Sequence, residues 1–297
     1  STLFFIALVM SSTAQEVSYM EMIKMQGGAF QSLPDSVWKG RKASLVVSSA
    51  LPYIKDEVDA VAAEAVLLIT KTAVNSTDTA LRRQVVGYLT ECLSSKGAFT
   101  ANAAKTGLNS FRASDFTLSS RKTIENLLTD ITTYNYVEIA RMAASKGIGY
   151  EAISMVFYNE KMNIEKKWSL AIALTRLGNK QVEEWILSKL NKANPEASFV
   201  EAIVPDLVFT RSKPVIDFCV SLLQDESLKC SCVNPDVSTK VECGYRIMEW
   251  LAPIVVNFPV KFDSIGMLKN DNEYKNALIA VRKWFNDNPE YEIIRTE

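Results

Sequence analysis

The chain has 297 residues, of which 48% are hydrophobic and 23% charged, and it carries 33 basic against 34 acidic side chains. A net charge of −1 provides no basic excess for nucleic acid or anionic lipid, so neither is expected as a partner. The chain contains no histidine, which excludes histidine-dependent nucleophile activation and the common histidine-containing zinc sites. We therefore expect a non-catalytic protein with no metal and no cofactor.

The N-terminus resembles the end of a secretory signal peptide. An apolar run over residues 3–10 is too short to span a bilayer, which needs about 20 helical residues. Ser12 and Ala14 then supply the small residues that signal peptidase accepts at positions −3 and −1. We interpret residues 1–14 as a signal peptide remnant and expect the mature chain to begin at Gln15, although a buried N-terminal helix or strand is an alternative. The first interpretation predicts a protein exported from a bacterial cell, with no membrane insertion after signal removal.

Beyond the N-terminus, apolar residues recur at intervals of three and four, the period of a helix with one buried stripe. No segment shows a convincing strand period of two. Within 163–191, Gly178 and Asn179 interrupt the pattern, so we expect one helix to end there and Asn179 to cap the next. The other predicted helices are 40–51, 57–74 with 79–94, 119–132 with 135–145, 196–209 with 213–224, and 239–256 with 272–286.

The paired helices form repeated helical hairpins. From residue 119 onward, their first helices begin at intervals between the low thirties and the mid forties, the range of two-helix solenoid repeats. A single hairpin cannot bury its apolar face alone, so stacking creates one continuous core with an extended groove. We therefore expect residues 15–297 to form a single all-α domain, an α-α superhelix of about five helical hairpins.

One repeat carries a family resemblance. The segment from Leu174 to Leu190 reads LTRLGNKQVEEWILSKL and resembles a HEAT repeat, in which a leucine–glycine turn joins two helices. The C-terminal stretch, residues 243–253 with Trp284-Phe285 and 288–293, resembles the end of secreted bacterial HEAT-like proteins without assigned function. The resemblance implies an armadillo-like α-solenoid and, as the usual function of such solenoids, protein binding. It implies no catalytic residue.

Four of the five cysteines lie in or beside an insertion, residues 225–240, that interrupts the repeat length. In an oxidising compartment this cluster favours a disulfide across a loop. We expect Cys243 to bond either Cys230 or Cys232, closing a loop of about a dozen residues. Zinc is the alternative, but the cluster lacks paired C-x-x-C spacing and the chain has no histidine to complete a ligand set. Cys92 stands alone and is expected to be a small core residue.

Aromatic residues provide the candidate binding sites. Four tryptophans lie on apolar helical stripes and are predicted to be buried, namely Trp168, Trp185, Trp250 and Trp284. Trp38 instead precedes the basic stretch 39–42 near a helix start, a polar setting in which exposure is expected. Tyr134 and Tyr136 occupy a turn between two helices, and tyrosine is a common anchor at interfaces. We therefore select Trp38, Tyr134 and Tyr136 as candidate binding residues.

Carboxylates are the main chemical groups left for catalysis. One acidic cluster comprises Asp56, Glu57, Asp59 and Glu64. Its spacing places the acids around a helix start, where they interact favourably with the helix dipole, and this interpretation is preferred to a metal site. We expect a non-catalytic protein- or peptide-binding scaffold of the bacterial envelope or secreted fraction. The alternatives are a carboxylate-dependent hydrolase or lyase acting on a periplasmic polymer, and a structural spacer in an envelope assembly.

Overall fold

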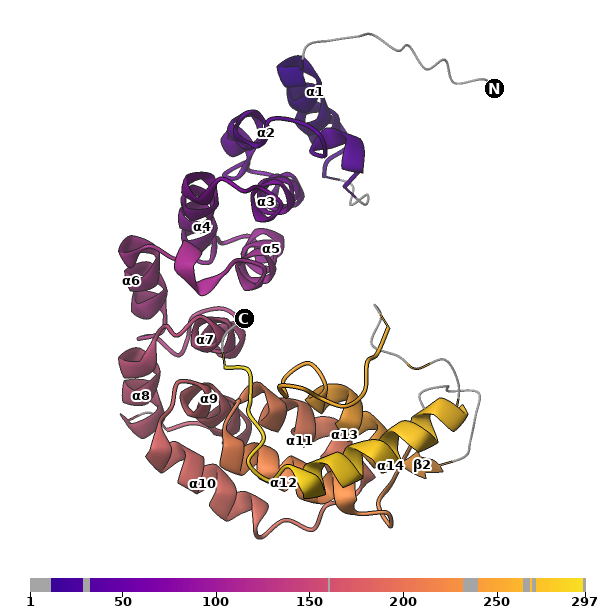
Figure 1. The fold of residues 1–297 in the computed structure, drawn as a ribbon. Helices are drawn as coiled ribbons and strands as arrows, with labels where there is room; N and C mark the ends of the chain where they lie inside the picture. Colours follow the sequence, from indigo (N-terminus) through magenta and orange to yellow (C-terminus); the bar gives the residue numbers. More distant parts are fainter. Residues whose placement is uncertain are drawn as a thin grey trace. The chain divides into compact units, whose positions relative to one another are not determined.

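The computed structural model of the chain describes residues 12–28, 33–159, 161–231, 240–263, 268 and 271–295. The chain divides into two compact units, Ser1–Ala152 and Ile153–Glu297 (Figure 1). Helices dominate the described part of both units, which confirms the all-α prediction. The apolar run at 3–10, on which the signal-peptide prediction depends, lies outside the described residues.

The helices of the first unit lie in two rows. They are α1 (Ser12–Met25), α2 (Ala43–Ala50), α3 (Asp59–Val74), α4 (Thr79–Cys92), α5 (Ala98–Asn109), α6 (Leu118–Leu127) and α7 (Tyr136–Ser145), with short 3-10 turns η1 (Asp35–Val37), η2 (Leu51–Tyr53) and η3 (Ala113–Asp115). Besides its neighbours in sequence, α3 contacts α1 and α5, α5 contacts α7, and α4 contacts α6. Helices α3, α5 and α7 therefore form one row, and α4 and α6 belong to the other (Figure 1).

Helix α3 is the most enclosed element of this unit. The side chains of residues 61–66 are all buried, and six consecutive positions cover every side of a helix. This is expected of a helix that is hydrophobic all round. Helix α3 also approaches α5 closely at Gly107, where a Cβ atom would lie 2.7 Å from Thr70 Oγ1. The absence of a side chain at Gly107 therefore allows the two helices to pack at this distance.

Two acids of the acidic cluster, Asp56 and Asp59, serve helix starts as the spacing predicts, whereas Glu64 is buried within α3. The Asp59 carboxylate, at the beginning of α3, accepts hydrogen bonds from the backbone amides of Phe99 and Thr100 at 2.9 and 3.0 Å. It therefore caps the first turn of α5 from another helix. Asp56 accepts a hydrogen bond from the Val58 amide at 3.0 Å, just before α3 begins. Both carboxylates satisfy backbone N–H groups near helix N-termini.

The second unit repeats the two-row arrangement. Its helices are α9 (Ile164–Arg176), α10 (Lys180–Leu190), α11 (Ala197–Phe209), α12 (Lys213–Gln224), α13 (Gly244–Leu251) and α14 (Asp271–Asp287), and α8 (Tyr150–Asn159) contains the point at which the units divide. Helix α9 contacts α11, which contacts α13, while α10 contacts α12, which contacts α14. Each row thus contains alternate helices of the sequence.

A small strand pair interrupts the helices between α12 and α13. Strands β1 (Lys229–Ser231) and β2 (Lys240–Glu242) are antiparallel, with Cys230 opposite Val241. The sequence predicts no strand, and it predicts a helix over 239–256 of which α13 occupies only the central part. The prediction is wrong at its start because the backbone of β2 pairs with β1 instead of forming helical hydrogen bonds.

The predicted helix stop and cap at residues 178 and 179 are correct, but the predicted burial of four tryptophans is wrong. At Gly178 φ is +90°, and the Asn179 side chain accepts a hydrogen bond from the Val182 amide at 3.1 Å, so the predicted stop and cap are both present. The four tryptophans predicted to lie in the core are only half-buried. Trp168 illustrates the reason, because its indole Nε1 donates to Asp206 Oδ2 at 3.2 Å and thus occupies a partly polar site.

Candidate functional site

An exposed surface of aromatic and amide side chains lies on α5 and the turn before α7. Phe99, at the start of α5, is 53% exposed, and Tyr134, in the turn, is 51% exposed. Asn102 follows Phe99 by one helical turn on the same side of α5. Its Nδ2 donates to Tyr134 Oη at 3.4 Å, and its Oδ1 accepts from Asn135 Nδ2 at 2.7 Å. We call these four residues the aromatic–amide face.

An apolar pocket of about 310 Å³ lies further along the same side of α5. Helix α5 contributes Thr106, one turn after Asn102, and α3 contributes Leu67, Lys71 and Val74. The pocket therefore lies in the groove between two helices of one row, close to the aromatic–amide face. Its volume is sufficient for an apolar side chain of a bound polypeptide.

A second pocket, of about 480 Å³, lies at the C-terminal end of α3. It is lined by Trp38 and the residues that follow it, by Thr72, and by the turn 75–77. Trp38 Nε1 and Thr72 Oγ1 are both buried, and neither has a hydrogen-bond partner in the described part of the chain. A buried polar group without a partner costs about 1–3 kcal/mol. We call this cavity the Trp38 pocket.

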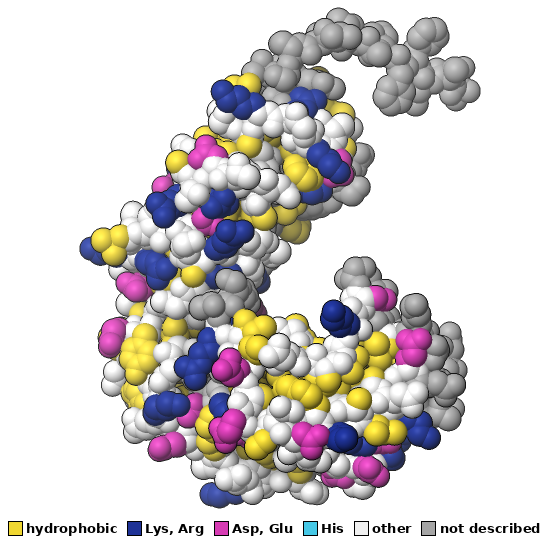
Figure 2. Space-filling model, viewed as in Figure 1, with side chains coloured by type: hydrophobic (Ala, Val, Ile, Leu, Met, Phe, Trp, Pro, Cys, Tyr) yellow, Lys and Arg dark blue, Asp and Glu magenta, His cyan; other side chains and the backbone are white. Residues whose placement is uncertain are grey.

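Charged side chains surround the Trp38 ring. Lys71 Nζ lies 5.0 Å from the ring centroid, within the range of a cation–π interaction. The same ammonium group lies 3.4 Å from Asp35 Oδ1, and Lys39 Nζ lies 3.8 Å from Asp35 Oδ2. On the visible surface of the first unit, basic, acidic and hydrophobic side chains are interspersed (Figure 2). The charged side chains around the Trp38 ring therefore form a local group and do not belong to a larger charged patch on this surface.

The three candidate binding residues have different surroundings. Tyr134 belongs to the aromatic–amide face, and Trp38 lines the pocket named after it. Tyr136 is buried, and its hydroxyl donates to the Leu128 carbonyl at 2.9 Å. Burial and, to a smaller degree, the charge of Asp130 raise the Tyr136 pKa to about 12. The prediction of Tyr136 as a surface anchor is wrong because this residue begins the buried stripe of α7.

Two residues of the aromatic–amide face are missed by the sequence analysis. Phe99 and Asn102 lie on α5, a helix that the hydrophobic pattern does not predict. The spacing of three between them is visible in the sequence, but its meaning depends on knowing that the segment is helical. Thr72 was also missed, because its position in the Trp38 pocket depends on packing between α3 and the chain around Trp38.

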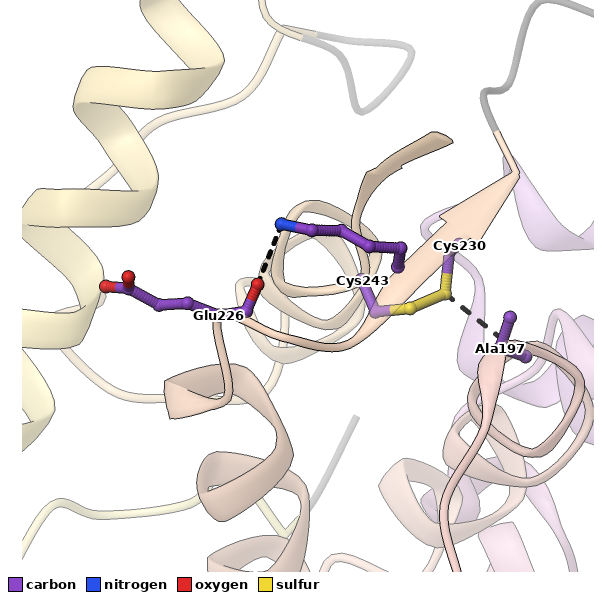
Figure 3. The surroundings of a disulfide bond; sticks show 5 residues. Ala197, Glu226, Cys230 and Cys243 are labelled. Carbon is purple, nitrogen blue, oxygen red and sulfur yellow. Dashed lines mark hydrogen bonds between the residues drawn. A yellow bond between two sulfur atoms is a disulfide. The ribbon is translucent and has the colours of Figure 1, made fainter. Parts of the chain in front are cut away.

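The predicted disulfide is present in the second unit. Cys230 on β1 is bonded to Cys243, which directly precedes α13, with a Cα–Cα distance of 4.9 Å. Cys232, the alternative partner, lies outside the described residues. Figure 3 shows the disulfide beside Ala197, whose carbonyl oxygen lies 4.0 Å from Cys230 Sγ. In the same place, the Lys229 ammonium group donates a hydrogen bond to the Glu226 carbonyl at 2.7 Å. The disulfide therefore fastens the strand pair to the start of α13.

The remaining described cysteines have properties of core residues. Cys92 and Cys219 are free and buried. Burial raises the pKa of the Cys92 thiol to about 11, and burial also raises the pKa of Cys219. Neither side chain is therefore suited to act as a nucleophile or metal ligand at neutral pH. Among the described residues, no three or more cysteine or carboxylate side chains are arranged to hold a metal ion.

Comparisons with known proteins yield no match, so the function is inferred from the geometry described above. No protein-family model matches the chain, and neither a curated protein nor a solved structure matches it. Within the described ranges, no helix combines the length and the apolar character that crossing a bilayer requires.

Proposed function

We propose that this chain is a HEAT-like helical-repeat protein that binds an extended polypeptide segment on the aromatic–amide face of its first unit. The alternation of helix contacts supports the repeat architecture, because each row contains every second helix in both units. Helical hairpins stacked in this way present an extended surface along each row of helices, and such a surface is suited to an extended ligand.

The aromatic–amide face carries the proposal. A primary amide offers both a donor and an acceptor, and a peptide backbone requires the same pair. Asn102 and Asn135 present such amides, and Tyr134 Oη accepts a bond from Asn102 while its own proton has no acceptor among the described residues. Exposed aromatic side chains at Phe99 and Tyr134 supply contact area at small entropic cost. The neighbouring apolar pocket would take one apolar side chain of the ligand.

The proposed location is an exported, oxidising compartment. The disulfide between Cys230 and Cys243 supports this, because such bonds persist mainly outside the reducing cytosol. The proposed role is binding without catalysis.

Selection from a display library of random linear peptides, using the purified full chain, tests the proposal. The expected result is a set of related peptides that bind in solution. The double variant Phe99→Ala/Tyr134→Ala should weaken their binding about tenfold or more, since truncation of interface aromatics commonly costs above 1 kcal/mol. The matched control is Leu118→Ala on α6, which removes an 84% exposed apolar side chain elsewhere in the same unit. Failure to enrich any peptide, or equal binding by both variants, would overturn the proposal.

A further inference from the structure

A short extended segment of the second unit follows α14 and packs back onto the helices. We call residues 291–295 the strap, the last part of the yellow trace after α14 (Figure 1). Its backbone pairs antiparallel with residues 254–256, just after α13. The Ile294 amide donates to the Ile254 carbonyl at 2.8 Å, and the Val256 amide donates to a strap carbonyl at 3.0 Å. The strap is therefore held by the backbone bonds with which extended peptides add to a protein.

One buried side chain anchors the strap. Tyr291 is 8% exposed, and its ring lies edge-on to Phe285 with the two centroids 5.0 Å apart. Lys213 Nζ lies 4.1 Å from the Tyr291 ring centroid, and the Tyr291 hydroxyl donates to Asp217 Oδ1 at 2.7 Å. Helices α12 and α14 thus supply a ring, a cation and an acceptor for a single tyrosine. We call these three side chains, together with residues 254–256, the strap site.

Two features allow another segment to replace the strap. Residues 287–290, which connect the strap to α14, are all exposed, so this connection can move without opening the core. The strap also fills its surroundings incompletely. A cavity of about 490 Å³ remains where the strap begins, lined by Trp284, Asn257 and residues 287–292 among others. A ligand with a larger apolar side chain just before its tyrosine would therefore gain contacts that the strap lacks.

We propose that the strap site is a second polypeptide-binding site, which the strap keeps closed, and that its partner is an extended segment with a tyrosine followed two positions later by an aliphatic residue. This spacing is that of Tyr291 and Ile293 in the strap. The tyrosine of the partner donates to Asp217 in place of Tyr291, and its backbone takes over the pairing with residues 254–256. The site lies in the second unit and is independent of the aromatic–amide face.

Fluorescence anisotropy with a labelled synthetic peptide of residues 287–295 tests the exchange in the full chain. Tyr291→Ala removes the anchor of the strap. It should bind the peptide at least tenfold more tightly than the unaltered chain, in which the strap competes at the high effective concentration of a linked ligand. The matched control is Ile279→Ala, which truncates a 58% exposed apolar side chain of α14 and should bind no better than the unaltered chain. Equal binding by Tyr291→Ala and the unaltered chain, or binding by neither, would overturn the proposal.

Ile294→Pro keeps the test valid if Tyr291→Ala does not fold. It removes one backbone bond of the strap at a 41% exposed position, so the variant should melt cooperatively and bind the peptide several-fold more tightly than the unaltered chain. Adding Asp217→Ala should weaken this binding several-fold, because the tyrosine of the peptide loses its acceptor. A peptide with alanine in place of its tyrosine should not bind. Binding of that peptide, or no gain by a folded Ile294→Pro, would refute the assigned site.

Two further measurements test whether a separate partner can displace the strap. A peptide with leucine in place of Glu290 should bind several-fold more tightly than the strap sequence, because the leucine fills part of the cavity beside Trp284. Equal or weaker binding would overturn the displacement. In size-exclusion chromatography the unaltered chain should remain a monomer. A dimer that Tyr291→Ala abolishes would show that two copies exchange their straps, and would overturn the assignment to a separate partner.

Discussion

Glu64 should contribute more to the stability of the first unit in acid than at neutral pH. This side chain lies on α3, is 1% exposed, and its Oε2 is buried without a hydrogen-bond partner in the described part of the chain. Burial raises the Glu64 pKa above its ordinary value of 4.5, because the interior disfavours the carboxylate. The nearby Tyr19 hydroxyl is also unpartnered, and burial followed by the Glu64 charge raises its pKa to about 12.

The sign of the effect follows from proton binding. Between pH 4.5 and the raised pKa, the folded chain binds a proton at Glu64 that the unfolded chain has released. The contribution of Glu64 to the free energy of unfolding therefore falls as the pH rises through this interval, by at most about 1.4 kcal/mol for each pH unit. The full stability from the neutral carboxyl is present below pH 4.5 and is lost above the raised pKa.

Glu64→Gln isolates this contribution because the amide imitates the protonated acid and cannot ionise. Thermal unfolding followed by circular dichroism should show the variant and the unaltered chain melting together near pH 4.5. At pH 7.5 the variant should melt several degrees higher, since 1 kcal/mol corresponds to about 2–4 °C for units of this size. Glu57→Gln, on the exposed surface just before α3, is the control and should show no such difference. A variant that melts lower at pH 7.5, or a difference independent of pH, would refute the reasoning.

Two further predictions concern the second unit. Trp185→Ala should lower the free energy of unfolding by about 2–3 kcal/mol, below the usual cost for a fully buried tryptophan because Trp185 is half-buried, whereas exposed Glu184→Ala should change it by no more than about 0.5 kcal/mol. Denaturant melts that give equal losses would contradict the helix-face assignment. Mass mapping without reductant should recover Cys230 linked to Cys243, and reduction should cost about 2–3 kcal/mol for this separation of 13 residues. Complete alkylation of both thiols in the oxidised, native protein would contradict the pairing.

Helices with a clear apolar stripe were predictable, and α5 shows why others were not. The α5 segment contains mostly alanine, threonine and other small side chains, so it offers few of the large apolar residues that mark a buried stripe. Its burial depends on contact with α3, where Gly107 of α5 lies close to Thr70 of α3, and this pairing is not encoded in a local period. The strand β2 is short and is determined by its partner β1, which the helical period of the following residues conceals.

The candidate site was predictable only in part, for a related reason. A turn with two tyrosines was visible in the sequence. Tyr134 precedes α7 and is exposed, whereas Tyr136 begins the buried stripe of α7, and the sequence does not show where this helix starts. Trp38 was recognised from its polar neighbours. Its pocket also requires Thr72, which lies 34 positions away and reads as an ordinary helical residue in the sequence.

The cap that Asp59 provides has a consequence for how the first unit opens. The first turn of α5 takes its hydrogen-bond acceptor from the start of α3, 40 residues earlier, and not from its own preceding segment. The amides of Phe99 and Thr100 therefore lose their protection against solvent exchange whenever α3 detaches, even if α5 stays helical. Conversely, α5 cannot release its first turn without exposing the Asp59 carboxylate. The two helix starts thus belong to one cooperative opening unit, with the whole of α4 enclosed between them in the chain.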